Sequence, residues 1–422
     1  MGNTPNVRFK GFTEDWEQRK LGDLVIIERG GSPRPINKFI TEDENGLNWV
    51  KIGDAPERGN YITQTKEKIR YEGLSKTREV HPGDLILSNS MSFGRPYIMA
   101  IDGCIHDGWL LIRDNEKRFD LKYLCYMLGT DMMLSQYKQM AAGSTVNNLN
   151  KELVGNTVVK YPSPEEQSKM GDYFSIFDNL ITLHQQKCDE TKEFKKYMLQ
   201  NMFPQKDEKV PKIRFDGFTG DWEQRKLEDF GKATGGTSIE SEFSEDGIYK
   251  VISIGSYSEN SVYNDQGIRA IKSDKTNNRV LNRNDLTMIL NDKTTSGNII
   301  GRVLLIEESG IYVYNQRTER IEINLDEYDP VFLYEMLNAP NIREKIIKQA
   351  QGNTQIYVNW TAISLLEYMI PSKEEQVKIG EYLHSIGNLI TLHQQKCNAL
   401  KEFKKYMLQN MFPQKGENKC QN

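Results

Sequence analysis

The sequence has few cysteines and no long apolar run. Five cysteines occur among 422 residues and none stands in a Cys-x-x-Cys pair, which indicates reduced thiols and neither a disulfide framework nor a zinc site. No apolar stretch reaches the length that crosses a bilayer. The first residues also lack the charged-then-apolar layout of a secretory signal. These absences predict a cytoplasmic protein with no membrane partner.

An excess of positive charge is missing as well. The formal net charge is -4. Residues 25–160 hold 18 lysines and arginines against 17 acids, and residues 231–370 hold 14 against 19. A protein that coats nucleic acid by charge alone needs a clear positive excess. If DNA is the ligand, the cations must therefore gather on one face, or a partner must supply contacts to the phosphates.

Catalytic motifs are also lacking. The sequence contains no Gly-x4-Gly-Lys-Ser/Thr loop, no Gly-x-Gly-x-x-Gly, no His-Glu-x-x-His, no Gly-x-Ser-x-Gly and no Asn-Pro-Pro-aromatic tetrapeptide. The acid–lysine cluster from Glu166 to Lys169 is interpreted as a solvated helix face. His184 and His393 are interpreted as half-buried positions that fix helix register, not as metal or proton sites. We predict no catalytic residue and no metal site, and hence a binding and positioning protein.

What the sequence does contain is a constant frame written twice around unrelated inserts. The repeated pieces are KEFKKYMLQNMFPQK at 192–206 and 401–415, LITLHQQKC from Leu180 and Leu389, and VRFKGFTEDWEQRKL from Val7 with IRFDGFTGDWEQRKL from Ile213. A fixed frame with two different inserts predicts two units of shared topology that recognise different things.

The repeats divide the chain into five predicted segments. The segments are a first recognition domain at 1–162, a helix at 163–206, a second recognition domain at 207–371, a helix at 372–415, and a tail at 416–422. Prolines in the linker Met202–Lys212 end the first helix and restart the pattern.

Both helical segments begin with a capping signal, Ser163-Pro164 in one and Ser372 in the other. Apolar residues then follow a heptad spacing, which predicts a helix seam. The seam residues are Met170, Phe174, Phe177, Ile181, His184 and Cys188 in the first helix, and Ile379, Leu383, Ile386, Ile390, His393, Cys397, Leu400, Met407 and Met411 in the second. A 40-residue helix is about 60 Å long. We expect an antiparallel coiled coil with one globular unit at each end.

The inserts are predicted to be mixed α and β, so the fold class is α+β. Expected strands are Asp84–Ser88, Ile98–Ile101, Asp285–Leu290, Val303–Ile306 and Ile311–Tyr314. Each insert is expected to end in one helix, Leu121–Ala142 in the first and Pro330–Gln351 in the second. Trp16 and Trp222 belong to the constant frame and are expected to be packing anchors.

Three duplicated motifs resemble the specificity subunit of type I restriction-modification systems. The first is Trp-x4-Leu-x-Asp at Trp16 and Trp222, followed by Gly30-Gly31 and Gly235-Gly236. The second is Gly83-Asp84-Leu85 with Gly94-Arg95; its second copy, Asn284-Asp285-Leu286 with Gly301-Arg302, lacks the first glycine. The third is Pro-Ser-x-x-Glu-Gln at Pro162 and Pro371. The resemblance covers almost the whole chain.

The resemblance implies a subunit without catalysis of its own. Each domain is expected to read one half of a split, asymmetric double-stranded DNA target, and the paired helices to set the gap. A span of about 60 Å corresponds to about 17 base pairs. The helices are also expected to dock two methyltransferase subunits that bind S-adenosylmethionine. Motor-nuclease subunits that use ATP and Mg²⁺ are expected to join them, with no cofactor on this chain.

Exposed polar loops are the expected DNA contacts, because base edges are read by Arg, Lys, Asn and Gln and phosphates by other polar groups. The candidates in the first domain are Ser32, Arg34, Ser88, Asn89, Ser90, Arg95, Ser144, Thr145 and Asn147. The candidates in the second are Thr237, Ser238, Asn291, Lys293, Thr294, Thr295, Arg302, Gln316, Arg317, Asn353, Thr354 and Gln355. Each of these residue types also favours ordinary solvated turns.

Two other functions are compatible with the sequence. One is a two-lobed scaffold that joins proteins without reading DNA. The other is a self-sufficient DNA enzyme whose active site carries no familiar motif. A sequence-selective band shift in the presence of a methyltransferase distinguishes DNA reading from the scaffold, and activity of the purified chain alone would establish the enzyme.

Overall fold

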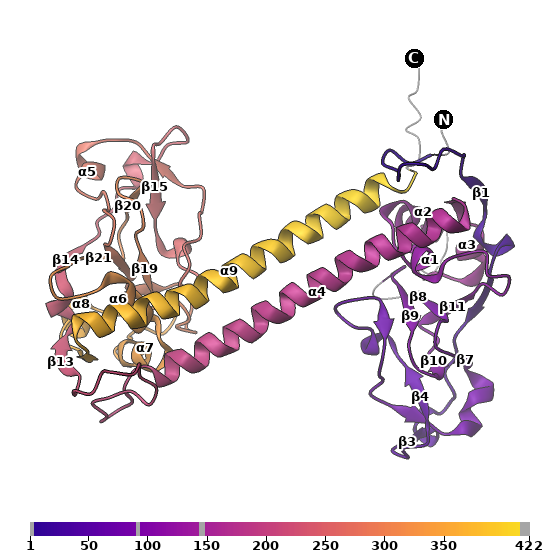
Figure 1. Ribbon diagram of the computed structural model, residues 1–422, viewed down its shortest axis with the longest axis horizontal. Coiled ribbons are helices and arrows are strands. Elements are labelled where there is room, and N and C mark those ends of the chain that lie inside the picture. The colour runs from indigo at the N-terminus through magenta and orange to yellow at the C-terminus, as the bar shows by residue number, and fades with distance from the viewer. Residues whose placement is uncertain (1–3, 90–92, 143–147, 414–422) are drawn as a thin grey trace. The chain divides into compact units, whose positions relative to one another are not determined.

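The computed structural model describes residues 4–89, 93–142 and 148–413. The chain forms two compact units: unit 1 comprises residues 1–186 and 394–422, and unit 2 comprises residues 187–393. Each unit contains one globular domain and a part of both long helices, α4 (Pro164–Asn201) and α9 (Lys373–Asn410) (Figure 1). The division of the chain into five segments stays a prediction.

Unit 1 contains two five-stranded sheets. The first has the order β2-β11-β8-β9-β5, with β2 Ile26–Arg29, β11 Trp109–Arg113, β8 Leu85–Ser88, β9 Pro96–Met99 and β5 Tyr61–Ile62. The second has the order β3-β6-β4-β10-β7, with β3 Ile40–Thr41, β6 Lys68–Ile69, β4 Leu47–Val50, β10 Gly103–Ile105 and β7 Arg78–Val80. β1 (Glu17–Lys20) pairs with β12 (Val158–Tyr161). Figure 1 shows β4, β7 and β10 beyond β8 and β11 as seen from the helices.

The first sheet is apolar on both faces because it separates two cores. Successive side chains of a strand point to opposite faces. Leu85 and Leu87 therefore join the core that the helices share, whereas Ile86 packs with Val50 and Ile105 of the second sheet. Burial on both faces explains why β8 has no polar–apolar alternation.

Unit 2 repeats this topology. Its sheet β14-β21-β17-β19 corresponds to β2-β11-β8-β9, and its sheet β16-β15-β20 corresponds to β6-β4-β10. The parallel pair β15–β20 matches the parallel pair β4–β10. The strands are β14 Gly231–Gly235, β21 Thr318–Ile323, β17 Leu286–Ile289, β19 Val303–Leu305, β16 Arg269–Ala270, β15 Tyr249–Ile252 and β20 Tyr312–Tyr314. Two short pairs are β13 (Glu223–Lys226) with β23 (Glu367–Ile370), and β18 (Asn291–Asp292) with β22 (Ile356–Tyr357). The predicted strands are thus present, displaced by a residue or two.

The helix expected at the end of each insert is two helices. In unit 1, α1 (Leu121–Leu128) ends at Gly129, and Thr130 caps α2 (Asp131–Ala141). In unit 2, α6 (Pro330–Asn338) is followed at once by α7 (Pro340–Ile347). The prediction of one continuous helix was wrong, because a new N-cap in one unit and a proline at the first helical position in the other start a second helix. The remaining helices are α3 Lys151–Gly155, α5 Asp274–Asn277 and α8 Trp360–Ile363.

The long helices pack antiparallel within each unit. In unit 1, Asp178 of α4 contacts Lys404 of α9, and the Cys397 thiol donates to the carbonyl of Ile181. In unit 2, the Cys188 thiol donates to the carbonyl of Ile390. The predicted seam is confirmed, because its residues are buried or half-buried throughout. The prediction of an α+β fold with two repeated globular domains and a long antiparallel helix pair is thereby confirmed.

The Glu and Gln of the Pro-Ser-x-x-Glu-Gln motif are buried at the helix start. Glu166 and Glu375 are each 1% exposed. Arg8 donates two bonds of 2.8 Å to Glu166, and Arg214 donates bonds of 2.7 and 2.8 Å to Glu375. Gln167 bonds to three backbone groups. The interpretation of Glu166 as part of a solvated face was wrong, because its side chain is buried and paired with Arg8. That partner lies 158 residues away, so the local sequence does not reveal it.

Two further constant features have a structural role. Trp16 packs edge-on against Tyr123 and Phe412, and Trp222 packs against Phe203 and Phe332, which confirms both tryptophans as packing anchors. The missing glycine of the second motif is also explained. Gly83 has φ +95° and Asn284 has φ +72°, a left-handed conformation that asparagine tolerates better than most residues.

Candidate nucleic-acid interface

The predicted loops of unit 1 meet at one edge of the sheet that contains β8 and β11. The backbone N–H of Gly30 donates to the Trp109 carbonyl over 2.9 Å. The N–H of Asn89 donates to the Gly108 carbonyl over 2.9 Å. Because neighbouring antiparallel strands end and begin at the same edge, the loops after β2 and β8 lie beside the loops before β9 and β11.

Two candidates at this edge are buried and hold the loops together. Ser88 is 0% exposed and its Oγ accepts the N–H of Arg95 over 3.0 Å. Asn89 is 2% exposed and its Nδ2 donates to the Asp107 carbonyl over 2.8 Å. Arg95 itself is exposed, with its guanidinium 4.9 Å from the centre of the Tyr97 ring. Arg95 therefore presents a charged group to solvent on a supported loop.

The other unit 1 candidates divide into two groups. Ser32 is half-buried and its Oγ donates to the Asp107 carboxylate over 3.0 Å, while Arg34 is exposed. The remaining candidates lie outside the described residues: Ser90, Ser144, Thr145 and Asn147. Asp107, which no sequence motif singles out, thus organises this edge through both its carboxylate and its carbonyl.

Unit 2 brings its candidate loops to the corresponding edge. The N–H of Gly236 donates to the Thr318 carbonyl over 2.8 Å, which places residues 237–238 beside residues 315–317. The amide oxygen of Asn315 accepts the N–H of Ile239 over 3.0 Å. In this way the loop after β14 is fixed to the loop before β21.

The two remaining loops of unit 2 join the same edge. Asn291 and Asp292 form β18, which pairs with β22 and sets the loop 293–296 beside the turn 353–355. The N–H of Leu290 donates to the Arg317 carbonyl over 2.9 Å, which links this pair to the 315–317 loop. Thus four loops that are distant in sequence form one continuous edge.

Most unit 2 candidates are exposed. The exposed residues are Thr237, Ser238, Lys293, Thr294, Thr295, Gln316, Arg317, Asn353, Thr354 and Gln355, and Asn291 is half-buried. Arg302 differs, because its guanidinium donates to the Asn298 carbonyl and to Ser261 Oγ, each over 3.0 Å. Burial lowers the pKa of Arg302, and its contacts fit a role in holding the loop.

Sequence reasoning missed Arg279 at this edge. Its guanidinium donates to the Gly235 carbonyl over 2.9 Å and to Thr237 Oγ1 over 3.0 Å, and it lies over the Tyr314 ring at 5.3 Å. No spacing signals it, because it lies in an irregular stretch far from the glycine pair in sequence. With Lys293 and Arg317, it brings three cations to this edge of an acidic domain.

Acidic side chains adjoin the same edge: Asp292 lies in β18, and Glu240 accepts from Gln316 Nε2 over 3.3 Å. Glu319 of β21 is 5% exposed, and desolvation raises its pKa to about 7, although Arg279 opposes the shift. Desolvation likewise lowers the pKa of His106 at the unit 1 edge. The charge on both edges therefore depends on burial as well as on composition.

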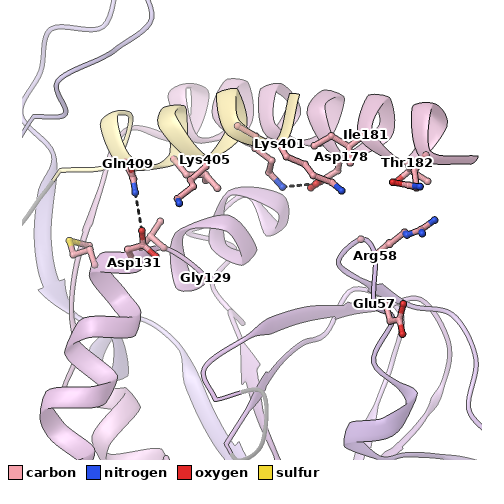
Figure 2. Close-up of a pocket in the computed structure, with 16 residues that line it drawn as sticks. Glu57, Arg58, Gly129, Asp131, Asp178, Ile181, Thr182, Lys401, Lys405 and Gln409 are labelled. Carbon is pink, nitrogen blue, oxygen red and sulfur yellow. Dashed lines mark hydrogen bonds and ion pairs between the residues drawn. The ribbon is translucent and has the colours of Figure 1, made fainter. Parts of the chain in front are cut away.

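Unit 1 also has a groove of about 600 Å³ between the long helices, the loop 57–59 and the turn 129–132 (Figure 2). Its cations are Arg58, Lys401, Lys404 and Lys405, and its acids are Glu57, Asp131 and Asp178. Figure 2 shows Gln409 bonded to Asp131, a contact of 3.2 Å. The groove thus places charged groups of the domain and of both helices side by side.

The helix pair of each unit exposes the same four apolar side chains. In unit 1 these are Leu180, Leu183, Phe403 and Tyr406; in unit 2 they are Leu389, Leu392, Phe194 and Tyr197. They are between 37% and 54% exposed. The leucines each lie one residue before a seam position, and Phe194 and Tyr197 occupy the places of Phe403 and Tyr406 in the repeated KEFKKYMLQN segment. We call each set of four the apolar face of its unit.

Within residues 4–89, 93–142 and 148–413, no group of three or more His, Cys, Asp or Glu side chains is arranged to hold a metal ion. In the same part of the chain, no helix combines the length and apolar character needed to cross a bilayer.

Comparisons with known proteins agree with these features. The family model of the type I restriction modification DNA specificity domain matches residues 13–193 and again residues 219–402. The chain is 24% identical over 409 residues to the type I restriction enzyme MjaVIII specificity subunit of Methanocaldococcus jannaschii, covering 94% of this chain and 91% of that one. It is 23% identical over 417 residues to the putative MjaX specificity subunit of the same organism, covering 94% and 92%.

Solved structures show the same fold. The S subunit of the type I restriction-modification system from M. genitalium superposes with a TM-score of 0.65 at 12% identity, covering 98% of this chain and 100% of that one. A chain from a study of complex assembly and conformational transition in a type I system gives 0.53 at 15% identity, covering 94% and 97%. Because the family model accounts for both halves of the sequence, the chain belongs to the family of type I restriction-modification specificity subunits.

Proposed function

We propose that this chain reads a bipartite, asymmetric double-stranded DNA target, one half with each loop edge. The observation that carries the proposal is the convergence of candidate loops at the same edge of two sheets of equal topology. Side chains that read bases must be exposed on supported loops, and Arg95 in unit 1 and Arg317 in unit 2 meet that condition. The two edges carry different side chains, so each half-sequence differs.

The cations at these edges support the proposal despite the acidic net charge. Arg279, Lys293 and Arg317 lie on loops that the structure brings together in unit 2. Local clustering steers and holds a polyanion even when the whole chain is acidic. Partner subunits supply the remaining phosphate contacts in this proposal.

The paired helices are the spacer in this proposal. α4 and α9 have 38 residues each, which corresponds to about 57 Å at 1.5 Å per residue and to about 17 base pairs at 3.4 Å per pair. A helix pair with a buried heptad seam is stiff enough to fix the gap between half-sites.

The apolar faces are the docking sites for two methyltransferase subunits. An exposed cluster of large apolar side chains is typical of a protein–protein interface. The four residues of one face recur in the other, as expected if the same partner binds twice. In this proposal the methyltransferases bind S-adenosylmethionine, motor-nuclease subunits bind ATP and Mg²⁺, and this chain binds no cofactor and stays non-catalytic in the cytoplasm.

An exchange of one insert tests the proposal. Residues 25–160 are replaced by the corresponding insert of a family member with a different target, in cells that carry the complete system. Methylation mapping is expected to show a new sequence in one half of the target, with the other half and the gap unchanged. The reciprocal exchange of residues 231–370 is expected to change only the other half. A change of both halves after either exchange contradicts the proposal.

The two-lobed scaffold is the second candidate function. The apolar faces fit a scaffold as well as they fit a DNA-reading subunit that docks methyltransferases. A band shift with a methyltransferase present distinguishes the two, because a scaffold shows no preference among duplexes. Methylation or cleavage by the purified chain alone contradicts both candidates.

A further inference from the structure

A lysine of the constant frame is half-buried against each recognition domain. Lys195 and Lys404 occupy the same place in the repeated KEFKKYMLQN segment, and their side chains are 18% and 16% exposed. A buried lysine needs a carboxylate nearby, because the uncompensated charge is costly. The two units supply that carboxylate from different elements.

In unit 1 the carboxylate comes from the long helix. Lys404 Nζ donates to Asp178 of α4 over 2.5 Å and lies 4.8 Å from the centre of the Tyr126 ring. The hydroxyl of Tyr126 on α1 donates to the second oxygen of Asp178 over 2.5 Å. Asn60 adds a longer bond of 3.4 Å. In unit 1 the recognition domain therefore supplies hydrogen-bond donors, and α4 supplies the carboxylate.

In unit 2 the carboxylate comes from the domain. Lys195 Nζ donates over 2.8 Å to Glu335 of α6, which is 3% exposed. The helix position that corresponds to Asp178 is Gly387, and a Cβ there would lie 2.9 Å from Lys195 Nζ. Hence Gly387 leaves room for the lysine, and the helix offers no charge.

The two arrangements are equivalent by position. α1 and α6 are each capped by an aspartate, Asp120 and Asp329, that accepts the N–H three residues on. Tyr126 and Glu335 each lie six residues after their cap. Tyr126 of the first domain therefore corresponds to Glu335 of the second, and Asp178 of α4 corresponds to Gly387 of α9.

We propose that these two pairs are a matching code that determines which recognition domain can seat on which long helix. A domain with tyrosine at this position requires aspartate on the helix, and a domain with glutamate requires glycine. A mismatch leaves either a half-buried lysine without a carboxylate or two carboxylates for one lysine. A recognition domain packs stably on the long helix only when the domain residue and the helix residue form one of these two pairs.

Swaps of the pair residues in the full chain test the code. The single variants are Y126E and D178G in unit 1, and E335Y and G387D in unit 2. The double variants Y126E/D178G and E335Y/G387D install the arrangement of the other unit. The readout is hydrogen exchange of α1 and α6, which reports opening at each junction separately.

Each single variant is expected to speed exchange of its own domain helix at least about tenfold. D178G and E335Y leave the lysine without its carboxylate, and Y126E and G387D place two carboxylates beside one lysine, and both kinds of mismatch are destabilising. Each double variant is expected to return to within about threefold of the parent. The controls are G387A, which adds the Cβ without charge, and D178N, which removes the charge without the helix cost of glycine. G387A is expected to remain near the parent, and D178N to follow D178G.

Rescue by the double variants is the decisive outcome, since a general loss of folding cannot produce it. The code is wrong if the increase in exchange rate of a double variant equals the product of the increases of its two single variants. It is also wrong if the single variants exchange at the rate of the parent. A chain with residues 25–160 in place of 231–370 extends the test. It is expected to protect its second α1 helix better with G387D than with Gly387, and equal protection overturns the code.

Discussion

At the residue scale, two buried glutamates of the constant frame are each paired with an arginine. Arg8 with Glu166 and Arg214 with Glu375 join the start of each globular domain to the start of its long helix. The hydrogen bond to Glu166 raises the pKa of Arg8. Both oxygens of each glutamate accept from the same guanidinium. Such two-bond pairing fixes the orientation of the two side chains as well as stabilising them.

Substitution R8A is expected to lower the free energy of unfolding by about 3 kcal/mol, because it leaves Glu166 buried and uncompensated. Urea unfolding of the full chain measures the change. The control is R19A, since Arg19 is exposed and lies 3.9 Å from exposed Glu17; its expected change is below about 0.5 kcal/mol. Equal effects of the two variants contradict the prediction.

Glu319 predicts a pH dependence at the unit 2 edge. Its pKa of about 7 lies above the usual value, so the folded state binds the proton more tightly than the unfolded state. Its contribution is fully present below about pH 4.5 and is lost as pH rises through 7. E319Q is therefore expected to exceed the parent in stability by about 3 kcal/mol at pH 8 and by little at pH 4.5.

Thermal unfolding of E319Q and the parent across this range measures the difference. The control is E322Q, because Glu322 lies on the same strand with 57% of its side chain exposed. A stability difference between E319Q and the parent that does not change with pH shows that the Glu319 carboxylate does not titrate in this window.

At the element scale, the long helices combine a buried seam with an exposed apolar flank. Leu383 of α9 is 0% exposed and packs in the unit 2 core, whereas Leu389 on the same helix is 43% exposed. Such a helix is held by tertiary packing on one side. The apolar side chains of the other side keep about half of their surface in water and are available to a partner.

The contrast between these leucines gives a matched test. L383A is expected to lower the free energy of unfolding by about 2–5 kcal/mol, through lost transfer energy and the remaining cavity. L389A is expected to change it by less than about 1 kcal/mol, since 43% of Leu389 is already exposed. Chemical denaturation of both variants measures the difference, and similar losses contradict the assignment of seam and flank.

At the scale of the whole molecule, the duplication places the same kind of apolar face on both units. Each unit carries one apolar face, and each face draws two residues from α4 or α9 and two from the other helix. The same partner surface therefore fits each unit. This arrangement predicts two independent sites for one kind of subunit.

Variant L180E/L183E is expected to reduce the bound methyltransferase subunits from two per chain to one, and addition of L389E/L392E is expected to abolish binding. Native mass spectrometry of the assembled complex counts the subunits. Q186E, at an exposed position of α4, is the control and is expected to keep both. Loss of both subunits from the unit 1 variant alone contradicts independent sites.

The sequence predicted the secondary-structure elements more accurately than the contacts between residues that are distant in sequence. Heptad spacing from Met170 to Cys188 and the cap at Ser372 marked the long helices, because both signals are local. The break at Gly129-Thr130 was missed, since a short cap inside an apolar run resembles one helix. Arg279 was missed because its role depends on a bond to Thr237, which is distant in sequence.

The sequence by itself determined the repeat, the α+β class, the helix seam and the family resemblance, since each depends on residue order or periodicity. Only the tertiary structure decided which loops share an edge, that Ser88 and Asn89 are buried, and that Lys195 and Lys404 meet their carboxylates from different elements. The physical reason is that burial and charge pairing are properties of the packed chain. Identical segments such as KEFKKYMLQN acquire different partners once the surrounding domains differ.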